Sequence, residues 1–266
     1  GSGERFSSDF VFGCGSRQGS LAVIALRDVH KRFGDLVVLD GVDFEVKRGE
    51  TMALLGPSGT GKSVLLKHIN GLLHPDSGSV NVDGMDVAHL KRRELANLRN
   101  RIGYVFQFGA LFDSMNVFEN IKLGITDNEC ASDRGYCENR VLECLDLVNL
   151  PQATAQKFPA DLSGGMKKRV GLARAIAGQP TYLLYDEPTS GLDPVNADII
   201  DSLVEKLRDE LGVTSVVVSH DVRGSFRVSD RIALLSEGRI QAMGTPDEMR
   251  KAENYAVQQF LERDFK

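Results

Sequence analysis

The sequence of 266 residues has no long apolar run and no surplus of basic charge. Its longest apolar stretches have the length of strands, far below the roughly 20 residues that a membrane-spanning helix requires. Lys and Arg number 32 against 37 for Asp and Glu, a formal net charge of -5, so no nucleic-acid partner is expected. With 42% hydrophobic and 26% charged residues, the composition excludes a disordered or collagen-like chain and is typical of a globular protein.

Cysteine is also scarce, and its spacing argues against a metal site. The four cysteines are Cys14, Cys130, Cys137 and Cys144, with no CxxC pair and no Cys/His cluster. The last three are seven residues apart, a spacing that can place them on one face of a helix. They are interpreted as small apolar residues. We expect free thiols, which fit a reducing compartment such as the cytoplasm.

Strand and helix patterns alternate along most of the chain, which favours an α/β fold with a mostly parallel sheet covered on both faces. Residues 1–20, which begin Gly-Ser-Gly, are interpreted as a cloning remnant and a loose tail. A hairpin is expected at Ser79–Val87, turning at Asp83-Gly84. The expected strands are Ala22–Val29, Val42–Val46, Thr51–Leu55, Ile102–Phe106, Tyr182–Tyr185, Ser215–Ser219 and Ile232–Leu235.

Helical patterns dominate between about residues 88 and 178, so this segment is interpreted as an insertion in the α/β core. The expected helices are Lys62–Leu72, Leu90–Asn97, Val117–Lys122, Glu138–Val148, Gly165–Ala177, Val195–Leu211 and Val222–Val228. One domain is predicted over residues 21–245, followed by a C-terminal extension of two short helices at residues 246–266.

A phosphate-binding loop follows the expected strand Thr51–Leu55. Residues 56–63 read GPSGTGKS and match GxxxxGK[ST] without a gap, between a strand and a helix. Small residues let backbone N–H groups wrap closely around phosphate oxygens. Lys62 is expected to reach the β- and γ-phosphates, and the Ser63 hydroxyl to bind Mg²⁺. The alternative is a plain glycine-rich turn. The expected ATP-binding residues here are Gly56, Pro57, Ser58, Gly59, Thr60, Gly61, Lys62 and Ser63.

Two acids, Asp186 and Glu187, directly follow the apolar strand Tyr182–Tyr185. A buried strand delivers them at its carboxyl end, where α/β sheets bind ligands. Asp186 is the candidate for holding Mg²⁺, and Glu187 the candidate general base for the attacking water. An inert, solvated Asp-Glu turn is the alternative, and the phosphate loop argues against it.

Five further motifs carry a resemblance to the ABC-type ATPases. Leu162-Ser163-Gly164-Gly165-Met166 resembles their LSGGQ signature, with Met166 in place of the usual Gln. Residues 190–193, ending in Asp193, resemble the D-loop. Phe33, Gln107 and His220 match the adenine-stacking aromatic, the Q-loop and the H-loop. The resemblance spans Leu21 to Met243. It implies a P-loop NTPase (RecA-like) core, an N-terminal antiparallel β subdomain and a helical ABC-type insertion.

The resemblance also implies roles for these residues and a working dimer. Ser163, Gly164 and Gly165 open a helix whose N-terminus suits an anion, so they are expected to face the ATP of a second copy together with Asp193. Gln107 is expected to contact Mg²⁺ and the attacking water, and His220 the γ-phosphate. Phe33 is expected to stack on adenine, although a core aromatic is the alternative.

The stretch Phe106–Met115, together with Met166–Arg169, is similar to the Mla/Mce-type ATPases that energise phospholipid transport between bacterial inner and outer membranes. This similarity implies a peripheral location on the cytoplasmic side of the inner membrane, on a permease that contacts Phe108–Phe118. Accessory transport subunits are also implied. In that region Leu111, Phe112, Met115, Val117 and Phe118 either meet the permease or pack the insertion onto the core. Import of a polar solute and a soluble, non-transport ABC ATPase are the alternative functions.

Overall fold

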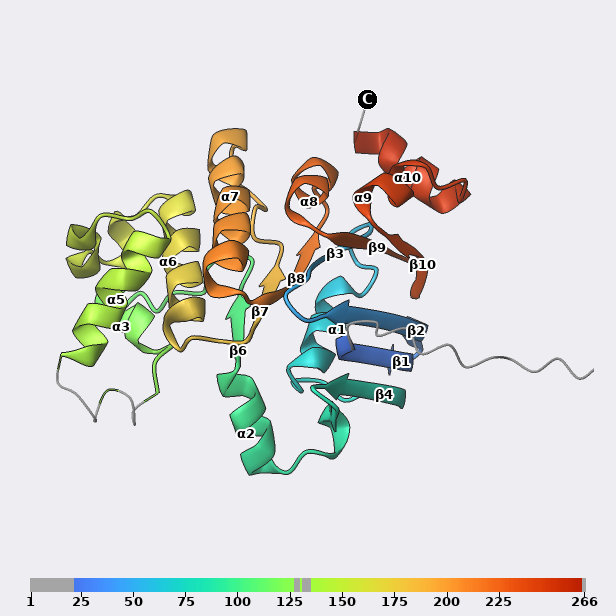
Figure 1. Cartoon of the computed structure of the whole chain (residues 1–266), viewed down its shortest axis with the longest axis horizontal. Helices are drawn as coiled ribbons and strands as arrows, with labels where there is room; N and C mark the ends of the chain where they lie inside the picture. The colour runs from blue at the N-terminus through green and yellow to red at the C-terminus, as the bar shows by residue number, and fades with distance from the viewer. Residues whose placement is uncertain (1–21, 127–129, 131–134, 265–266) are drawn as a thin grey trace, which may run out of the picture.

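Two β-sheets form the centre of the molecule (Figure 1). The computed structural model describes residues 22–126, 130 and 135–264, so the tail expected at residues 1–20 lies outside the described part of the chain. The smaller sheet is antiparallel, with the strand order β2-β1-β4-β5. Its strands are β1 (Ala22–Phe33), β2 (Leu36–Lys47), β4 (Ser77–Val82) and β5 (Met85–Asp86).

The larger sheet has the strand order β10-β9-β3-β8-β7-β6, and every neighbouring pair is parallel except β9 and β10. The predicted mostly parallel core and N-terminal antiparallel part are therefore confirmed. Strand β10 was not predicted, because its residues are mostly half-buried and give no clear alternation. The strands are β3 (Thr51–Leu55), β6 (Ile102–Val105), β7 (Tyr182–Asp186), β8 (Thr214–Ser219), β9 (Arg231–Ser236) and β10 (Arg239–Gly244).

Apolar strand residues alternate between the two faces of the larger sheet, as the period of a strand requires. On β3, Met52 and Leu54 join a buried cluster with the antiparallel sheet, whereas Ala53 and Leu55 face the C-terminal helices. Strand β7 divides in the same way, and its other face packs on the helical part of the chain. Both faces are covered, so ligands can reach the sheet only at its ends.

The helices lie on both sides of this sheet (Figure 1). Helix α1 is shorter than predicted because Asn70 caps it and Gly71 follows with a φ of 67°. In the described ranges, no helix combines the length and the hydropathy needed to cross a membrane. The helices are α1 (Lys62–Ile69), α2 (Arg92–Asn100), α3 (Val117–Lys122), α5 (Tyr136–Leu147), α6 (Gly164–Ala177), α7 (Pro194–Leu211), α8 (Val222–Val228), α9 (Pro246–Arg250) and α10 (Tyr255–Asp264).

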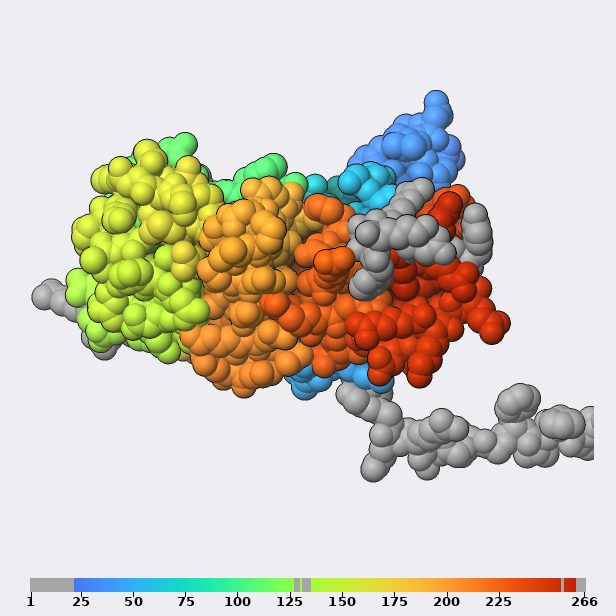
Figure 2. Space-filling view, turned by 90° about the horizontal axis from the view of Figure 1, so that it is seen from above, coloured from blue at the N-terminus to red at the C-terminus, as the bar shows by residue number. Residues whose placement is uncertain are grey.

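Helices α3, α5 and α6 form one end of the molecule, and α9 and α10 lie at the other (Figure 2). Val117 is fully buried in the helical end, and Leu111 and Phe118 pack against the same cluster. The expectation that the whole run Phe108–Phe118 meets a partner is therefore wrong for Val117. Phe108 remains 77% exposed and Phe112 55% exposed, so the surface part of this run lies ahead of α3.

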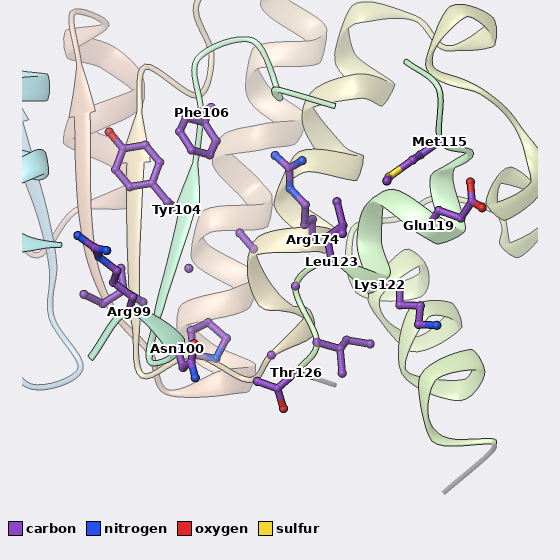
Figure 3. A pocket seen from close by; sticks show the side chains of 17 residues that line it. Arg99, Asn100, Tyr104, Phe106, Met115, Glu119, Lys122, Leu123, Thr126 and Arg174 are labelled. Atoms are coloured by element: carbon purple, nitrogen blue, oxygen red, sulfur yellow. The ribbon is translucent and has the colours of Figure 1, made fainter. Parts of the chain in front are cut away.

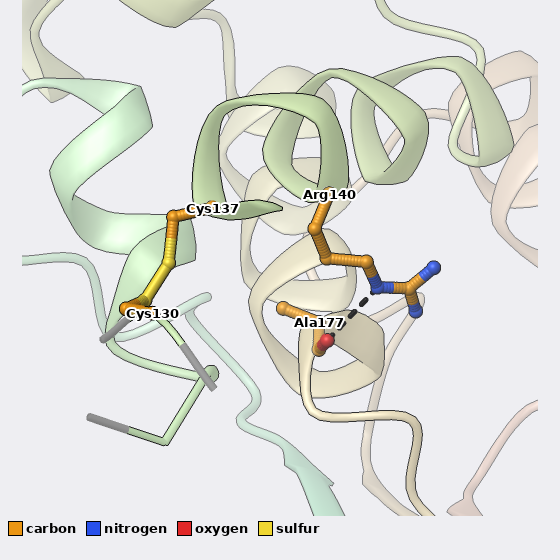
Figure 4. The surroundings of a disulfide bond; sticks show 4 residues. All are labelled: Cys130, Cys137, Arg140 and Ala177. Carbon is orange, nitrogen blue, oxygen red and sulfur yellow. Dashed lines mark hydrogen bonds between the residues drawn. A yellow bond between two sulfur atoms is a disulfide. The ribbon is translucent and has the colours of Figure 1, made fainter. Parts of the chain in front are cut away.

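The cysteines correct a prediction: Cys130 and Cys137 form a disulfide (Figure 4). In one continuous helix, residues seven apart would lie about 10 Å from each other along the axis. Helix α5, however, begins only at Tyr136, and the two Cα atoms are 5.4 Å apart. Cys144 is a free thiol, as expected, and its burial raises the pKa of the thiol to about 11. Cys14 lies outside the described residues.

Reduction of the Cys130–Cys137 bond is expected to lower the free energy of unfolding by about 2 kcal/mol, because the bond closes a short loop in the unfolded chain. Denaturant unfolding with and without dithiothreitol measures this. A chain with Cys130→Ser and Cys137→Ser is the control, and dithiothreitol should not change its unfolding midpoint. An oxidised parent whose midpoint is equally insensitive would contradict the expectation.

Candidate active site

A cavity of about 510 Å³ opens at the carboxyl ends of β3, β7 and β8. This is the edge where the loops of a parallel sheet bring side chains from separate strands together. The cavity is lined by Phe33, Val38, Ser58, Gly59, Gly61, Lys62, Ser63, Val64, Gln107, Glu187, Ser190 and His220. Nine of these were predicted site residues, and they come from five separate stretches of the sequence.

Glycine is required in the loop between β3 and α1 for two different reasons. A Cβ at Gly56 would lie 2.1 Å from the carbonyl oxygen of Leu235, so only glycine fits there. Gly59 and Gly61 have φ angles of 81° and 99°, a conformation that residues with a side chain rarely adopt. The loop then runs directly into the N-terminus of α1, where unpaired N–H groups favour an anion.

Lys62 is folded back against its own loop. Its Nζ donates to the carbonyl oxygens of Gly56 at 2.8 Å and Pro57 at 3.0 Å, and it lies 3.7 Å from Oε1 of Glu187. Burial lowers the pKa of Lys62, whereas the neighbouring Glu187 and Asp186 oppose this shift. The ammonium group therefore stands at the cavity with two neutral acceptors and a carboxylate, ready to exchange them for phosphate oxygens.

Asp186 is fixed by two hydroxyl groups from different elements. Its carboxylate accepts a hydrogen bond from Oγ of Ser63 at 2.6 Å and another from the hydroxyl of Tyr104 at 3.0 Å. Burial, together with the neighbouring carboxylate, raises the pKa of Tyr104, so its phenol stays protonated and donates. The predicted pair Ser63 and Asp186 thus lies together as a set of hard oxygen atoms.

Glu187 lies against His220 at the cavity. Its Oε2 lies 2.6 Å from Nδ1 of His220, and the carboxylate is largely buried. Gln107 donates through Nε2 to Oγ of Ser190 at 3.2 Å, on the segment that follows Glu187. Phe33 is 47% exposed and lines the cavity, away from the buried core. The geometry therefore allows Glu187 to act as a base that His220 orients. Phe33 adds an exposed aromatic ring to the same cavity.

The signature residues lie outside this cavity. Ser163 caps α6 by accepting a hydrogen bond from the N–H of Met166 at 3.3 Å, and Ser163 and Gly164 are exposed. Gly165 packs on the side chain of Asn196, which also donates to the carboxylate of Asp193 at 2.6 Å. The described part of the chain thus has a second helix N-terminus, beside the start of α7, that its own cavity does not use.

Comparison with known proteins identifies the family. The model of the family described as "ABC transporter" matches residues 39–190. The intermembrane phospholipid transport system ATP-binding protein MlaF of Haemophilus influenzae is 38% identical over 239 residues, which cover 90% of each chain. The chain belongs to the ABC transporter family. It is an ATP-binding subunit of a transporter, and the loop at residues 56–63 lies within the matched residues.

Other relatives of this ABC ATPase differ in their named roles. The methionine import ATP-binding protein MetN of Carboxydothermus hydrogenoformans is 43% identical over 206 residues, which are 77% of this chain and 60% of MetN. A structure of the cassette MJ0796, described as a dimeric post-hydrolysis state bound to ADP and Pi, superimposes with a TM-score of 0.73 at 33% identity. It covers 84% of this chain and 98% of MJ0796. This similarity confirms the predicted ABC fold.

Two residues that hydrogen-bond to Asp186 or to the segment after it were missed in the sequence. Tyr104 was treated as a strand residue, yet it pairs in register with Leu184 on β7 and so shares a face with Asp186. The alternation within Ile102–Val105 indicated which residues share a face with Tyr104. It did not indicate that β7 would be the neighbouring strand. Lys168 is buried on α6, and no role for it as a single residue was predicted.

Proposed function

We propose that this chain is the ATPase subunit that powers a separate membrane permease, and that the cargo is phospholipid moved between the inner and outer membranes of a bacterium. The observation that carries the ATPase role is the meeting of Lys62, Glu187 and His220 at one cavity, with Asp186 hydrogen-bonded to Ser63 of the same cavity. The cargo rests on similarity to MlaF. One ATPase domain at residues 21–245, with its insertion at about 88–178 and the extension at 246–266, would sit on the cytoplasmic side of the inner membrane through the permease.

ATP would occupy the cavity with its base at Phe33 and its phosphates at the loop. Backbone N–H groups of residues 56–63 and the N-terminus of α1 favour the phosphates, and Lys62 turns from its loop toward them. Ser63, Asp186 and Gln107 supply oxygen atoms of the kind that Mg²⁺ prefers. Bound Mg²⁺ would neutralise charge on the β- and γ-phosphates.

Glu187 would take the proton of the attacking water while the water oxygen bonds to the γ-phosphorus and ADP leaves. Its carboxylate is held at 2.6 Å by His220, so its direction is set before the water arrives. Gln107, through Ser190, would join the end of the ATP site to the helical part of the chain.

A second copy of the chain would complete each ATP site. The exposed N-terminus of α6 at Ser163 and Gly164, with Asp193 nearby, is suited to an anion that its own chain does not place there. Pairing two copies brings this helix end to the γ-phosphate of the partner. The dimeric description of the MJ0796 cassette supports this arrangement.

A groove of about 780 Å³ between β6 and helices α3 and α6 is the proposed permease site (Figure 3). Apolar side chains of Phe106, Met115 and Leu123 line it, and Phe106 and Leu123 are 43% and 51% exposed. Gln107 follows Phe106 directly, so a permease segment in this groove would lie next to the ATP site. Of the contact expected at Phe108–Phe118, only Met115 lines this groove, and the proposed site extends to β6 on one side and to α3 on the other.

Import of a polar solute is the second candidate. MetN matches with the higher identity, 43% against 38% for MlaF. The chain, however, spans 90% of MlaF and only 60% of MetN, so the phospholipid proposal accounts for more of the relative's length.

Purification of the chain with its native membrane partners, followed by mass spectrometry of bound lipids, tests the cargo. We expect phospholipid enriched over the bulk membrane and displaced when ATP is added. The complex carrying Lys62→Ala is the matched control, and ATP should displace no lipid from it. A bulk lipid profile, with a solute-binding protein in the complex, would instead support polar-solute import.

A further inference from the structure

Lys168 binds the segment between β7 and α7 with its ammonium group. The residue lies on α6, five positions after Ser163, and only 7% of it is exposed. Its Nζ donates to the carbonyl oxygens of Pro188 at 2.8 Å and Glu187 at 3.5 Å, and to that of Ser190. All three acceptors belong to four consecutive residues, so one side chain fixes the course of this segment.

The segment holds Glu187 in an unusual backbone conformation. Its φ angle is 53°, in the left-handed region that residues with a side chain disfavour. Such a conformation persists only where the surroundings determine it. On one side the N–H of Glu187 donates to Val218 at 3.0 Å. On the other side the ammonium group of Lys168 donates to the carbonyl oxygens of Glu187, Pro188 and Ser190.

A residue that only filled the space of Lys168 could be apolar, but it could not donate to the three carbonyl oxygens. Burial disfavours the ammonium group and lowers the pKa of Lys168 to about 8, while Glu187 opposes the shift. An aliphatic side chain would fill the same space without that cost. The three carbonyl oxygens offset the cost of burying the ammonium group because they all lie within hydrogen-bond distance of it. This arrangement indicates that the charge of Lys168 holds the segment 187–190 in place.

We propose that Lys168 is a positioning residue for ATP hydrolysis. It fixes the backbone at Glu187 so that the carboxylate stays at 2.6 Å from His220 and faces the attacking water. It also fixes Ser190, whose hydroxyl accepts the hydrogen bond of Gln107. Lys168 thereby links helix α6, which begins at the signature residues, to the general base Glu187 of the same chain. This inference rests on the proposed role of Glu187 as the general base.

Steady-state ATPase assays of Lys168→Met and Lys168→Gln test the proposal. Met has nearly the length of Lys but no N–H donors. We expect kcat to fall about ten-fold in Lys168→Met, because three buried carbonyl oxygens lose their donor. The KM for ATP should stay within about two-fold of the parent, because Lys168 does not contact the phosphates. Gln keeps two N–H donors, so its kcat should fall only about three-fold. Lys206→Met is the matched control, because Lys206 also donates to a backbone carbonyl, that of Leu147, at 3.0 Å. Its kcat should stay at the parental value.

A parental kcat in Lys168→Met, or an equal fall in Lys206→Met, would overturn the proposal. If Lys168→Met does not fold, as judged by thermal melting and ATP affinity, the kcat of Lys168→Gln decides by the same criterion. Adding Lys168→Met to a Glu187→Gln chain should leave the residual rate unchanged, and a further ten-fold loss would show that Lys168 does not act through Glu187. Parental activity of Glu187→Gln alone would instead overturn the proposed function.

Discussion

The Glu187→Gln chain is expected to bind ATP as the parent does and to hydrolyse it on the order of 10³-fold more slowly, the contribution typical of a positioned general base. The amide has nearly the shape of the carboxylate but cannot accept the proton of water. Its oxygen can still accept a hydrogen bond from His220, which lies 2.6 Å from Glu187. The phosphate loop is untouched, so nucleotide affinity should not fall.

Phosphate release measures the rate, and calorimetry measures the affinity. Glu237→Gln is a matched control, since Glu237 also has a left-handed backbone, with φ 52°, but lies in the turn between β9 and β10. The control should keep the parental rate. Size-exclusion chromatography with Mg-ATP should show Glu187→Gln as a dimer that persists. Hydrolysis at the parental rate would remove Glu187 from the role of base.

The sequence predicted which residues meet at the candidate site, because the motifs that carry them are local. The loop at residues 56–63 and the acids after Tyr185 each lie at the end of an apolar strand, and parallel strands bring their carboxyl ends to one edge. Strand β8 separates β3 from β7 in the sheet, so His220 at its end reaches Glu187. The parallel direction of the strands brings the groups to one edge, and the strand order places His220 beside Glu187.

Other features could not be predicted, because they depend on which elements become neighbours. Tyr104 reaches Asp186 only since β6 pairs with β7. Lys168 reaches the segment after Glu187 only since α6 packs beside it. The Cys130–Cys137 bond required knowing where α5 begins, and the burial of Val117 required the arrangement of three helices. Periodicity indicates a face, whereas the partner of that face is a property of the tertiary structure.

Replacing Lys62 by Ala is expected to lower the affinity for ATP by on the order of 10²-fold, the loss of a charge-assisted contact to phosphate. In the structure its Nζ already lies within hydrogen-bond distance of Gly56 and Pro57 and 3.7 Å from Glu187. Its movement toward the phosphates therefore exchanges weak neutral acceptors for charged ones. Removing it also leaves Glu187 without its nearby cation, so hydrolysis should fall together with binding.

Calorimetric titration with ATP measures the affinity, and thermal melting checks that the chain still folds. Lys67→Ala is the matched control, since Lys67 lies on the same helix and is exposed. The same substitution there should leave the affinity unchanged, which separates the phosphate contact from a general effect on α1. If Lys62→Ala binds ATP as tightly as the parent, the ammonium group does not contact the phosphates, and the N-terminus of α1 and the loop N–H groups alone hold them.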